Sequence, residues 1–155
     1  MNYKSIRKKH NGFALLYAVL ISSILLAIGL AIFNLTIKEL LLSSLGRDSQ
    51  FAFYAADTGA ECALYWDFDE VDAFATSSPA ASVNCGNKNV PVTATGGDGV
   101  YERTFDIDFS PEPYCAVVSV TKYESPLKTI IESRGYNTCD TANPRRVERA
   151  IRVTY

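Results

Sequence analysis

The run FALLYAVLISSILLAIGLAIF (residues 13–33) is long, apolar and uncharged, and the organisation of the whole chain follows from it. As an α-helix it would rise about 30 Å, which matches the hydrocarbon core of a bilayer. The basic residues that precede it, without any acid, are Lys4, Arg7, Lys8 and Lys9. Because basic flanks stay in the cytoplasm, we expect a single-pass anchor in the inner or cytoplasmic membrane. The N-terminus would lie inside, and residues 36–155 would be exported.

A cleaved secretory signal is the alternative interpretation of this run. Such a signal ends in a small-residue cleavage site that is followed by a polar mature start. Here the residues that follow, NLTIKELLL (34–42), continue in helical character, and Lys38 and Glu39 mark the far interface. The sequence therefore favours a membrane span over residues 13–35.

The same helix is expected to continue beyond the membrane. No proline occurs before Pro79, so one helix is predicted from Phe13 to about Trp66, with residues 36–66 in the exported domain. A stripe of small side chains recurs in this part at helical spacing: Ala52, Ala55, Ala56, Gly59 and Ala63. Such a stripe allows another element to approach closely. Packing on the domain's own sheet is favoured over packing on another subunit.

Residues 67–155 are predicted to form an irregular connector and a four-stranded antiparallel sheet. The connector, to about Asp98, is rich in Asp, Ser, Asn, Gly and Pro. Four β-rich runs follow it, at residues 101–109, 115–123, 128–136 and 147–155. In the first run, Arg103 is the exception on the apolar face. A long N-terminal spine helix packed on a small antiparallel sheet gives an α+β fold.

All four cysteines lie on the exported side, where cysteines usually pair. They are Cys62, Cys85, Cys115 and Cys139, and no C-x-x-C motif occurs among them. Two disulfides are therefore expected, with three connectivities open. We favour Cys62 with Cys85 and Cys115 with Cys139, since each pair closes a modest loop.

Composition argues against most enzyme classes and against a nucleic-acid partner. His10, in the basic N-terminal segment, is the only histidine, so a Ser/His/Asp triad, a Cys/His pair or a His-based zinc site cannot be built. The 15 Lys and Arg residues stand against 17 Asp and Glu residues and form no domain-wide basic patch. We predict a non-enzymatic protein that needs no cofactor.

Two charged clusters each allow a binding role. The carboxylates of Asp67, Asp69, Glu70 and Asp72 are a weak candidate for a calcium site. They lack the glycine and the terminal glutamate of an EF-hand loop, so a solvated acidic helix end is favoured. The basic residues Arg145, Arg146, Arg149 and Arg152 suit DNA or an acidic partner, but a solvated or salt-bridged edge strand is favoured.

Two motifs resemble those of type IV pilins. KKHNGF (residues 8–13) is similar to the class III signal of prepilins. RDSQFAFYAADTGA (residues 47–60) is similar to the R-D-x-x-x-A-x-x-A-A-[ED]-x-x-A stretch of PilX-like minor pilins. The resemblance implies a pilin-like fold and a basic leader, residues 1–12, that a prepilin peptidase removes between Gly12 and Phe13. It also implies N-methylation of Phe13.

The resemblance also implies partners and a location. Other pilins would pack along the N-terminal helix, and the pilus assembly machinery would carry the subunit to the pilus or the cell surface. Most pilins have Glu at the fifth mature position, where it neutralises a neighbour's N-terminal amine, but this chain has Tyr17. An uncompensated ammonium in an apolar filament core is unfavourable.

We therefore expect a minor pilin or pseudopilin that initiates or caps a filament. The alternative is an uncleaved single-pass membrane protein with an exported binding domain.

Overall fold

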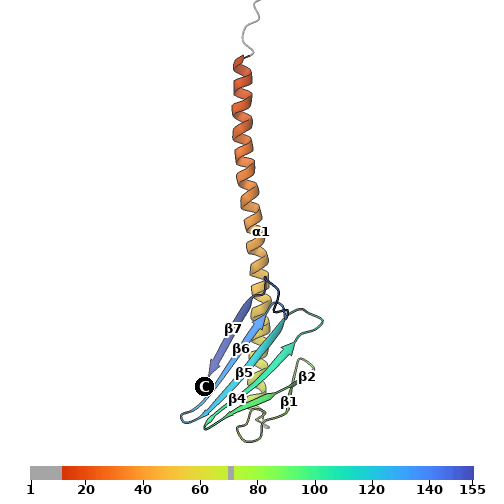
Figure 1. Cartoon of the computed structure of the whole chain (residues 1–155), viewed down its shortest axis with the longest axis vertical. Helices are drawn as coiled ribbons and strands as arrows, with labels where there is room; N and C mark the ends of the chain where they lie inside the picture. The colour runs from red at the N-terminus through yellow and green to blue at the C-terminus, as the bar shows by residue number, and fades with distance from the viewer. Residues whose placement is uncertain (1–11, 70–71) are drawn as a thin grey trace, which may run out of the picture. The chain divides into compact units, whose positions relative to one another are not determined.

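The structure, a computed structural model, describes residues 12–69 and 72–155. Its first element is the helix α1 (Gly12–Phe68), which is continuous, as predicted. The chain divides between Ser44 and Leu45 into two compact units, and α1 contributes residues to both (Figure 1).

In the first unit, the described residues belong to α1 alone. Every side chain from residue 13 to residue 43 is exposed, and Leu26 reaches 66%. The hydroxyls of Ser22, Ser23 and Thr36 donate hydrogen bonds of 3.0, 2.8 and 2.9 Å to carbonyls one turn earlier in the helix. Because the helix itself accepts their hydrogen bonds, these hydroxyls can lie in an apolar environment without a water partner. The helix is thus long and apolar enough to span a membrane.

The second unit holds the sheets. The strands among its described residues are β1 (Ser82–Cys85), β2 (Lys88–Pro91), β3 (Thr93–Gly97), β4 (Val100–Asp108), β5 (Cys115–Glu124), β6 (Leu127–Tyr136) and β7 (Glu148–Thr154). β1 and β2 form an antiparallel hairpin, and the other five strands form one antiparallel sheet in the order β3-β4-β5-β6-β7 (Figure 1). Neighbours in this sheet are consecutive in the chain, so the fold is α+β with an antiparallel meander.

The second part of α1 packs on β5 and β6 through its small side chains. Its buried residues are Ala52, Ala55, Ala56, Gly59, Ala60 and Ala63. A Cβ at Gly59 would lie 2.9 Å from Val118 Cγ2, and one at Gly135 of β6 would lie 3.0 Å from the carbonyl carbon of Ala55. Helix and sheet meet because neither glycine carries a side chain. The stripe therefore packs on the protein's own sheet, as favoured from the sequence.

The core lies between α1, the sheet and the segment before β1. Phe74 stacks on Phe105 of β4, with ring centroids 5.7 Å apart. Cys62 of α1 forms a disulfide with Cys85 of β1, and their Cα atoms are 5.9 Å apart. This is the first of the two favoured pairs. It ties the β1–β2 hairpin to the helix.

The prediction of an irregular connector and four strands is wrong. The connector contains β1, β2 and β3, and the main sheet has five strands. Gly86 and Asn87 join β1 to β2, and Asp98 and Gly99 join β3 to β4. Their φ angles are 59°, 63°, 53° and 83°, the backbone of two-residue type I′ turns. The Gly and Asn residues that made this segment resemble an irregular connector therefore include the turns of two hairpins.

Arg103 interrupts the apolar pattern of β4 because its side chain binds backbone carbonyls of the segment before β1. The residue is 3% exposed, and its guanidinium donates hydrogen bonds of 2.9–3.2 Å to the carbonyls of Ala75, Thr76, Thr95 and Glu102. Backbone acceptors thus compensate the buried charge. The contacts hold the segment before β1 against the β3–β4 hairpin.

Candidate functional site

The predicted cleavage site lies where α1 begins. Gly12 is the first described residue, and the Phe13 side chain is 70% exposed. The rings of Phe13 and Tyr17 lie one helical turn apart, with centroids separated by 5.6 Å. A phenol at this position supplies a hydrogen-bonding group but no carboxylate. Residues 1–11 lie outside the described part, so cleavage and methylation stay predictions.

Residues 13–35 of α1 present exposed large apolar side chains on all sides of the helix. Its exposed large side chains include Leu15, Leu20, Ile24, Leu30 and Phe33. Burial of one such side chain is worth about 1.5–3 kcal/mol, so water is an unfavourable environment for the whole set. Hydrocarbon or the apolar faces of other helices would cover it.

The 47–60 motif has a structural explanation within the second unit. Its alanines belong to the buried stripe that packs on the sheet. Asp48 Oδ2 lies 3.8 Å from a guanidinium nitrogen of Arg145, and Ser49 Oγ accepts a hydrogen bond of 2.8 Å from Arg149 Nε. The motif thus joins the helix to β5, β6 and the start of β7.

A polar cluster closes the end of α1. Lys122 of β5 is in phase with the buried Val120, and its Nζ lies 2.8 Å from Asp67 Oδ1 and 2.7 Å from Asp72 Oδ1. The hydroxyl of Tyr155 donates a hydrogen bond to the other oxygen of Asp67. Burial lowers the pKa of Lys122, but hydrogen bonds to both carboxylates outweigh it, so the pKa is raised above its ordinary value. Burial, and then Asp67, raise the pKa of Tyr155.

This cluster occupies two of the four carboxylates of the weak calcium candidate. Lys122 supplies the positive charge near Asp67 and Asp72, while Asp69 stands apart from these ion pairs and Glu70 lies outside the described residues. In residues 12–69 and 72–155, no three His, Cys, Asp or Glu side chains are arranged to hold a metal ion. The calcium hypothesis therefore gains no support. Sequence reasoning missed Lys122, although its place in the alternation of β5 was a usable signal.

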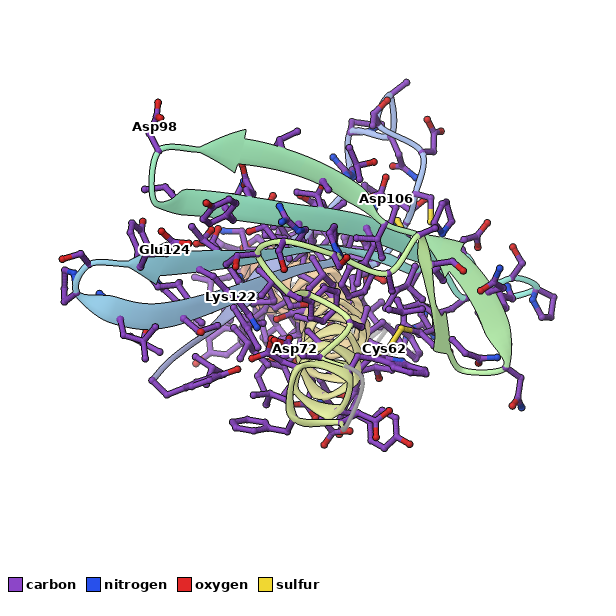
Figure 2. The ribbon with its side chains drawn as sticks, turned by 90° about the horizontal axis from the view of Figure 1, so that it is seen from below. Cys62, Asp72, Asp98, Asp106, Lys122 and Glu124 are labelled. Atoms are coloured by element: carbon purple, nitrogen blue, oxygen red, sulfur yellow. A yellow bond between two sulfur atoms is a disulfide. The ribbon has the colours of Figure 1, made fainter. Side chains whose placement is uncertain are left out.

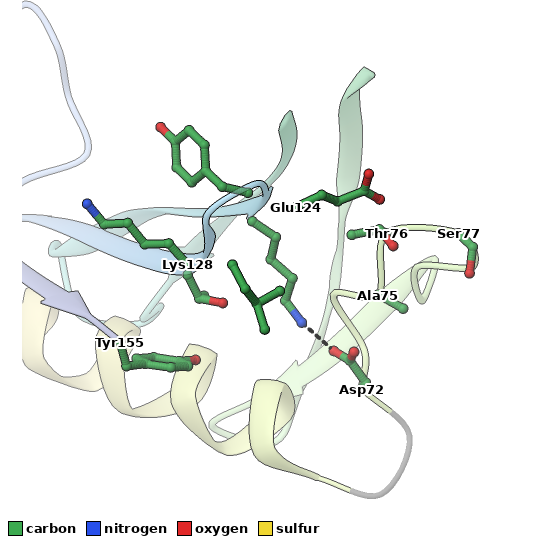
Figure 3. A pocket seen from close by; sticks show the side chains of 11 residues that line it. Asp72, Ala75, Thr76, Ser77, Glu124, Lys128 and Tyr155 are labelled. Atoms are coloured by element: carbon green, nitrogen blue, oxygen red, sulfur yellow. Dashed lines mark hydrogen bonds and ion pairs between the residues drawn. The ribbon is translucent and has the colours of Figure 1, made fainter. Parts of the chain in front are cut away.

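A cavity of about 560 Å³ opens beside this cluster (Figure 3). Its walls are Asp72, residues 75–77, the β5–β6 hairpin and Tyr155. Its charged lining residues are two acids, Asp72 and Glu124, and two bases, Lys122 and Lys128. The volume suits a small molecule, but the balanced charges select no ion of either sign.

The second favoured cysteine pair is not joined in the structure. Cys115 of β5 is partly buried, and Cys139 is exposed. Burial raises the pKa of the Cys115 thiol to about 12, and a hydrogen bond with the Cys139 thiol adds to the shift. The Cys139 N–H also donates a hydrogen bond of 2.9 Å to the Pro113 carbonyl. The two thiols are therefore neighbours, and the second disulfide stays a prediction.

The basic run lies on and before β7, which is an edge strand, as favoured from the sequence. Arg146 lies over the Tyr136 ring, 3.6 Å from its centroid. Arg152 stands opposite Glu132 in the β6–β7 register. Together with the Asp48 and Ser49 contacts, these partners explain the run as part of the domain's own surface.

No family model, curated protein or solved structure matches the chain. The function is therefore inferred from two features of the molecule. The first is the exposed apolar surface of the first unit, and the second is the close packing of α1 on the sheet in the second.

Proposed function

We propose that the protein is a minor pilin or pseudopilin, a non-enzymatic subunit that helps to initiate or cap a type IV pilus or a related filament. The supporting observation is α1, whose first part is apolar and exposed while its second part packs by alanine and glycine on an antiparallel sheet. A bilayer can cover the first part before assembly. Helices of other pilins can cover the same surface afterwards, by close packing of apolar side chains.

The proposed route begins in the cytoplasmic membrane. Basic residues hold the leader inside, and the second unit is exported. A prepilin peptidase cuts between Gly12 and Phe13, Phe13 is N-methylated, and the assembly machinery inserts the subunit among other pilins. The motif at residues 8–13 supports these steps.

Tyr17 supports a scarce, terminal subunit. Within a filament of this chain alone, each N-terminal ammonium would face a phenol where a carboxylate is usual, at a penalty of several kcal/mol, on the order of that for a broken buried ion pair. One copy at a filament tip avoids the repeated penalty. Its own amine can pair with the Glu of a neighbouring subunit of another kind.

Processing is the decisive test. A Gly12→Val variant should keep residues 1–12, while the matched Gly29→Val variant should be processed normally, since no atom lies within 4 Å of a Cβ at Gly29. Intact mass and N-terminal sequencing of membrane-derived protein distinguish the two. A wild-type protein that retains Met1, or mature Gly12→Val protein that begins at Phe13, would refute the pilin proposal.

Stoichiometry tests the terminal position. Quantitative mass spectrometry of sheared filaments, with immunogold labelling, should find this chain as a trace component at filament ends. Abundant label along the shaft would contradict the argument from Tyr17. A Tyr17→Glu variant should enter the shaft more often, whereas a Tyr17→Phe control should not.

One observation favours a second candidate, an uncleaved single-pass protein with an exported binding domain. The cavity beside Lys122 has the size of a small-molecule site. Retention of residues 1–12 in the mature protein would support this function over the first.

A further inference from the structure

The two edges of the main sheet differ in how they are protected. Proteins usually block an exposed edge strand with charge, proline or a covering segment. β7 carries charged Glu148, Arg149 and Arg152. β3 has the sequence TATGG (residues 93–97), which contains neither charge nor proline, and all five residues are exposed. The β3 edge is thus open to another strand.

The backbone of β3 has one free side. Its register with β4 places Gly97 opposite Val100 around the two-residue turn, so Thr93, Thr95 and Gly97 form the hydrogen-bonded pairs. The N–H and C=O groups of Ala94 and Gly96 therefore point away from β4. In the described residues, β4 is the one strand that pairs with β3. Figure 2 shows no strand beyond β3 on that side of the sheet.

A small cavity continues this edge. It has a volume of about 140 Å³ and lies at the start of β3, lined by Pro91, Thr93, Thr104, Phe105 and Asp106. A strand added to a sheet gains affinity from main-chain hydrogen bonds and specificity from pockets for its alternate side chains. The cavity provides one such pocket, and Asp106 is one of its lining residues.

The charge of the β3–β4 hairpin has one sign at its surface. Its acidic residues are Asp98, Glu102, Asp106 and Asp108, and all four are exposed. Figure 2 shows Asp98 at the hairpin turn and Asp106 further along β4. Arg103, the one cation of the hairpin, is buried under the sheet. An added strand with basic side chains would run beside the carboxylates of Asp98, Glu102 and Asp106 and would meet no exposed cation of the hairpin.

We propose that β3 is a docking edge for an extended segment of another polypeptide that carries Lys or Arg at alternate positions. The segment adds as a sixth strand, exchanges backbone hydrogen bonds with Ala94 and Gly96, and places a basic side chain beside Asp106. This inference does not depend on leader cleavage or on Tyr17. The docking proposal and the pilin proposal can therefore be refuted independently of each other.

A synthetic probe tests the edge directly. Full-length protein in an uncharged detergent is titrated with acetyl-Val-Lys-Thr-Lys-Val-Lys-amide, and NMR records amide shifts and hydrogen exchange. The lysine peptide should protect the amides of Ala94 and Gly96 and should bind at least about tenfold more tightly than the same peptide with Glu for Lys. An absence of binding at millimolar peptide, or equal binding of the two peptides, would overturn the proposal.

Matched variants separate the edge from general charge attraction. Ala94→Pro removes the outward N–H at an edge position where proline is tolerated, and Ala94→Val keeps it. The proline variant should bind the lysine peptide about tenfold more weakly and the valine variant should bind normally, with Trp66 fluorescence confirming that both are folded. Asp106→Asn should weaken binding without affecting the fold.

Equal binding by both Ala94 variants would overturn docking at β3. The wild type should also not self-associate in the absence of peptide. Self-association that Ala94→Pro abolishes would show that the edge binds a second copy of this chain, and would overturn the proposal of a different polypeptide.

Discussion

The two parts of α1 share one backbone conformation but differ in the size of their side chains. The first part is rich in Leu and Ile, and all of its residues from 13 to 43 are exposed. The second part presents Ala and Gly to the sheet, at distances where a single added methyl group would collide with β5. Side-chain size, and not helix propensity, thus sets what each part can contact. The experiments below test this difference between the two parts of α1.

The largest effect is expected from a side chain placed in the second part. Gly59→Leu would collide with Ser133, Val118 and Ala116, and should lower the free energy of unfolding by at least about 3 kcal/mol. Gly29→Leu in the first part meets no atom within 4 Å and should change it by less than about 0.5 kcal/mol. Urea unfolding in detergent, followed by the single tryptophan Trp66, measures both. Equal changes in the unfolding free energy of the two variants would contradict the proposed difference between the two parts of α1.

The disulfide between α1 and β1 should contribute the next largest amount. The bond closes a loop of 23 residues, so Cys62→Ala with Cys85→Ala should lower the unfolding free energy by about 3 kcal/mol. A matched Cys115→Ala and Cys139→Ala double variant shows whether the second pair contributes similarly. Thiol labelling of unfolded, unreduced wild-type protein should find no reactive cysteine. Four reactive thiols would show that neither disulfide forms.

A charge in the first part of α1 should impair membrane insertion and leave the stability of the second unit unchanged. Leu26→Lys places an ammonium near the middle of the apolar run and should disfavour membrane insertion by about 2.5 kcal/mol. The same variant in detergent should keep the wild-type unfolding curve of the second unit. Carbonate extraction of membranes measures insertion, with Leu26→Phe as the control. Normal extraction behaviour for Leu26→Lys would contradict the anchor.

The smallest effect is expected where the end of α1 meets Lys122. Lys122→Met leaves Asp67, whose side chain is 4% exposed, without its cation. The variant should lose about 2 kcal/mol, less than a fully buried pair, because the Asp72 side chain is 49% exposed. Lys122→Arg serves as a control that keeps the charge. No loss in the methionine variant would show that the pair is not stabilising.

The pH dependence of this pair has a definite sign. The pKa of Lys122 is raised in the folded protein, so its contribution is complete below the ordinary value of 10.5 and is lost as the pH rises through the folded pKa. Wild-type protein should therefore lose stability above about pH 10.5, and Lys122→Met should lose less. Tyr155 contributes with the same sign in both proteins, since its pKa is also raised. Identical alkaline profiles would contradict this assignment.

Local patterns in the sequence predicted most of the fold. The absence of proline predicted a continuous α1, and the β-rich runs, with alternation in the first and last of them, placed β4 to β7 to within one residue at each end. The connector was mispredicted because β1 to β3 are only four or five residues long and contain turn-forming residue types. Short strands carry too few alternating positions to be distinguished from a loop.

The candidate sites were less predictable than the elements. Lys122 and Arg103 occupy positions in phase with buried residues, which marks them as unusual, but their partners come from segments far away in the chain. Lys122 meets Asp67 and Asp72, and Arg103 meets the carbonyls of Ala75 and Thr76. Spacing along one strand contains no information about which loop passes beside it.

The order of neighbouring side chains is enough to give the apolar character and length of α1, the small-residue stripe, and the strand type of the segments that become β4 to β7. Three other features follow from the tertiary arrangement: the stripe faces β5 and β6, Lys122 neutralises the acidic helix end, and β3 is an edge. Each of these depends on which distant segments share a surface. That choice is made by close packing and charge compensation over the whole domain, and not by any local run of residues.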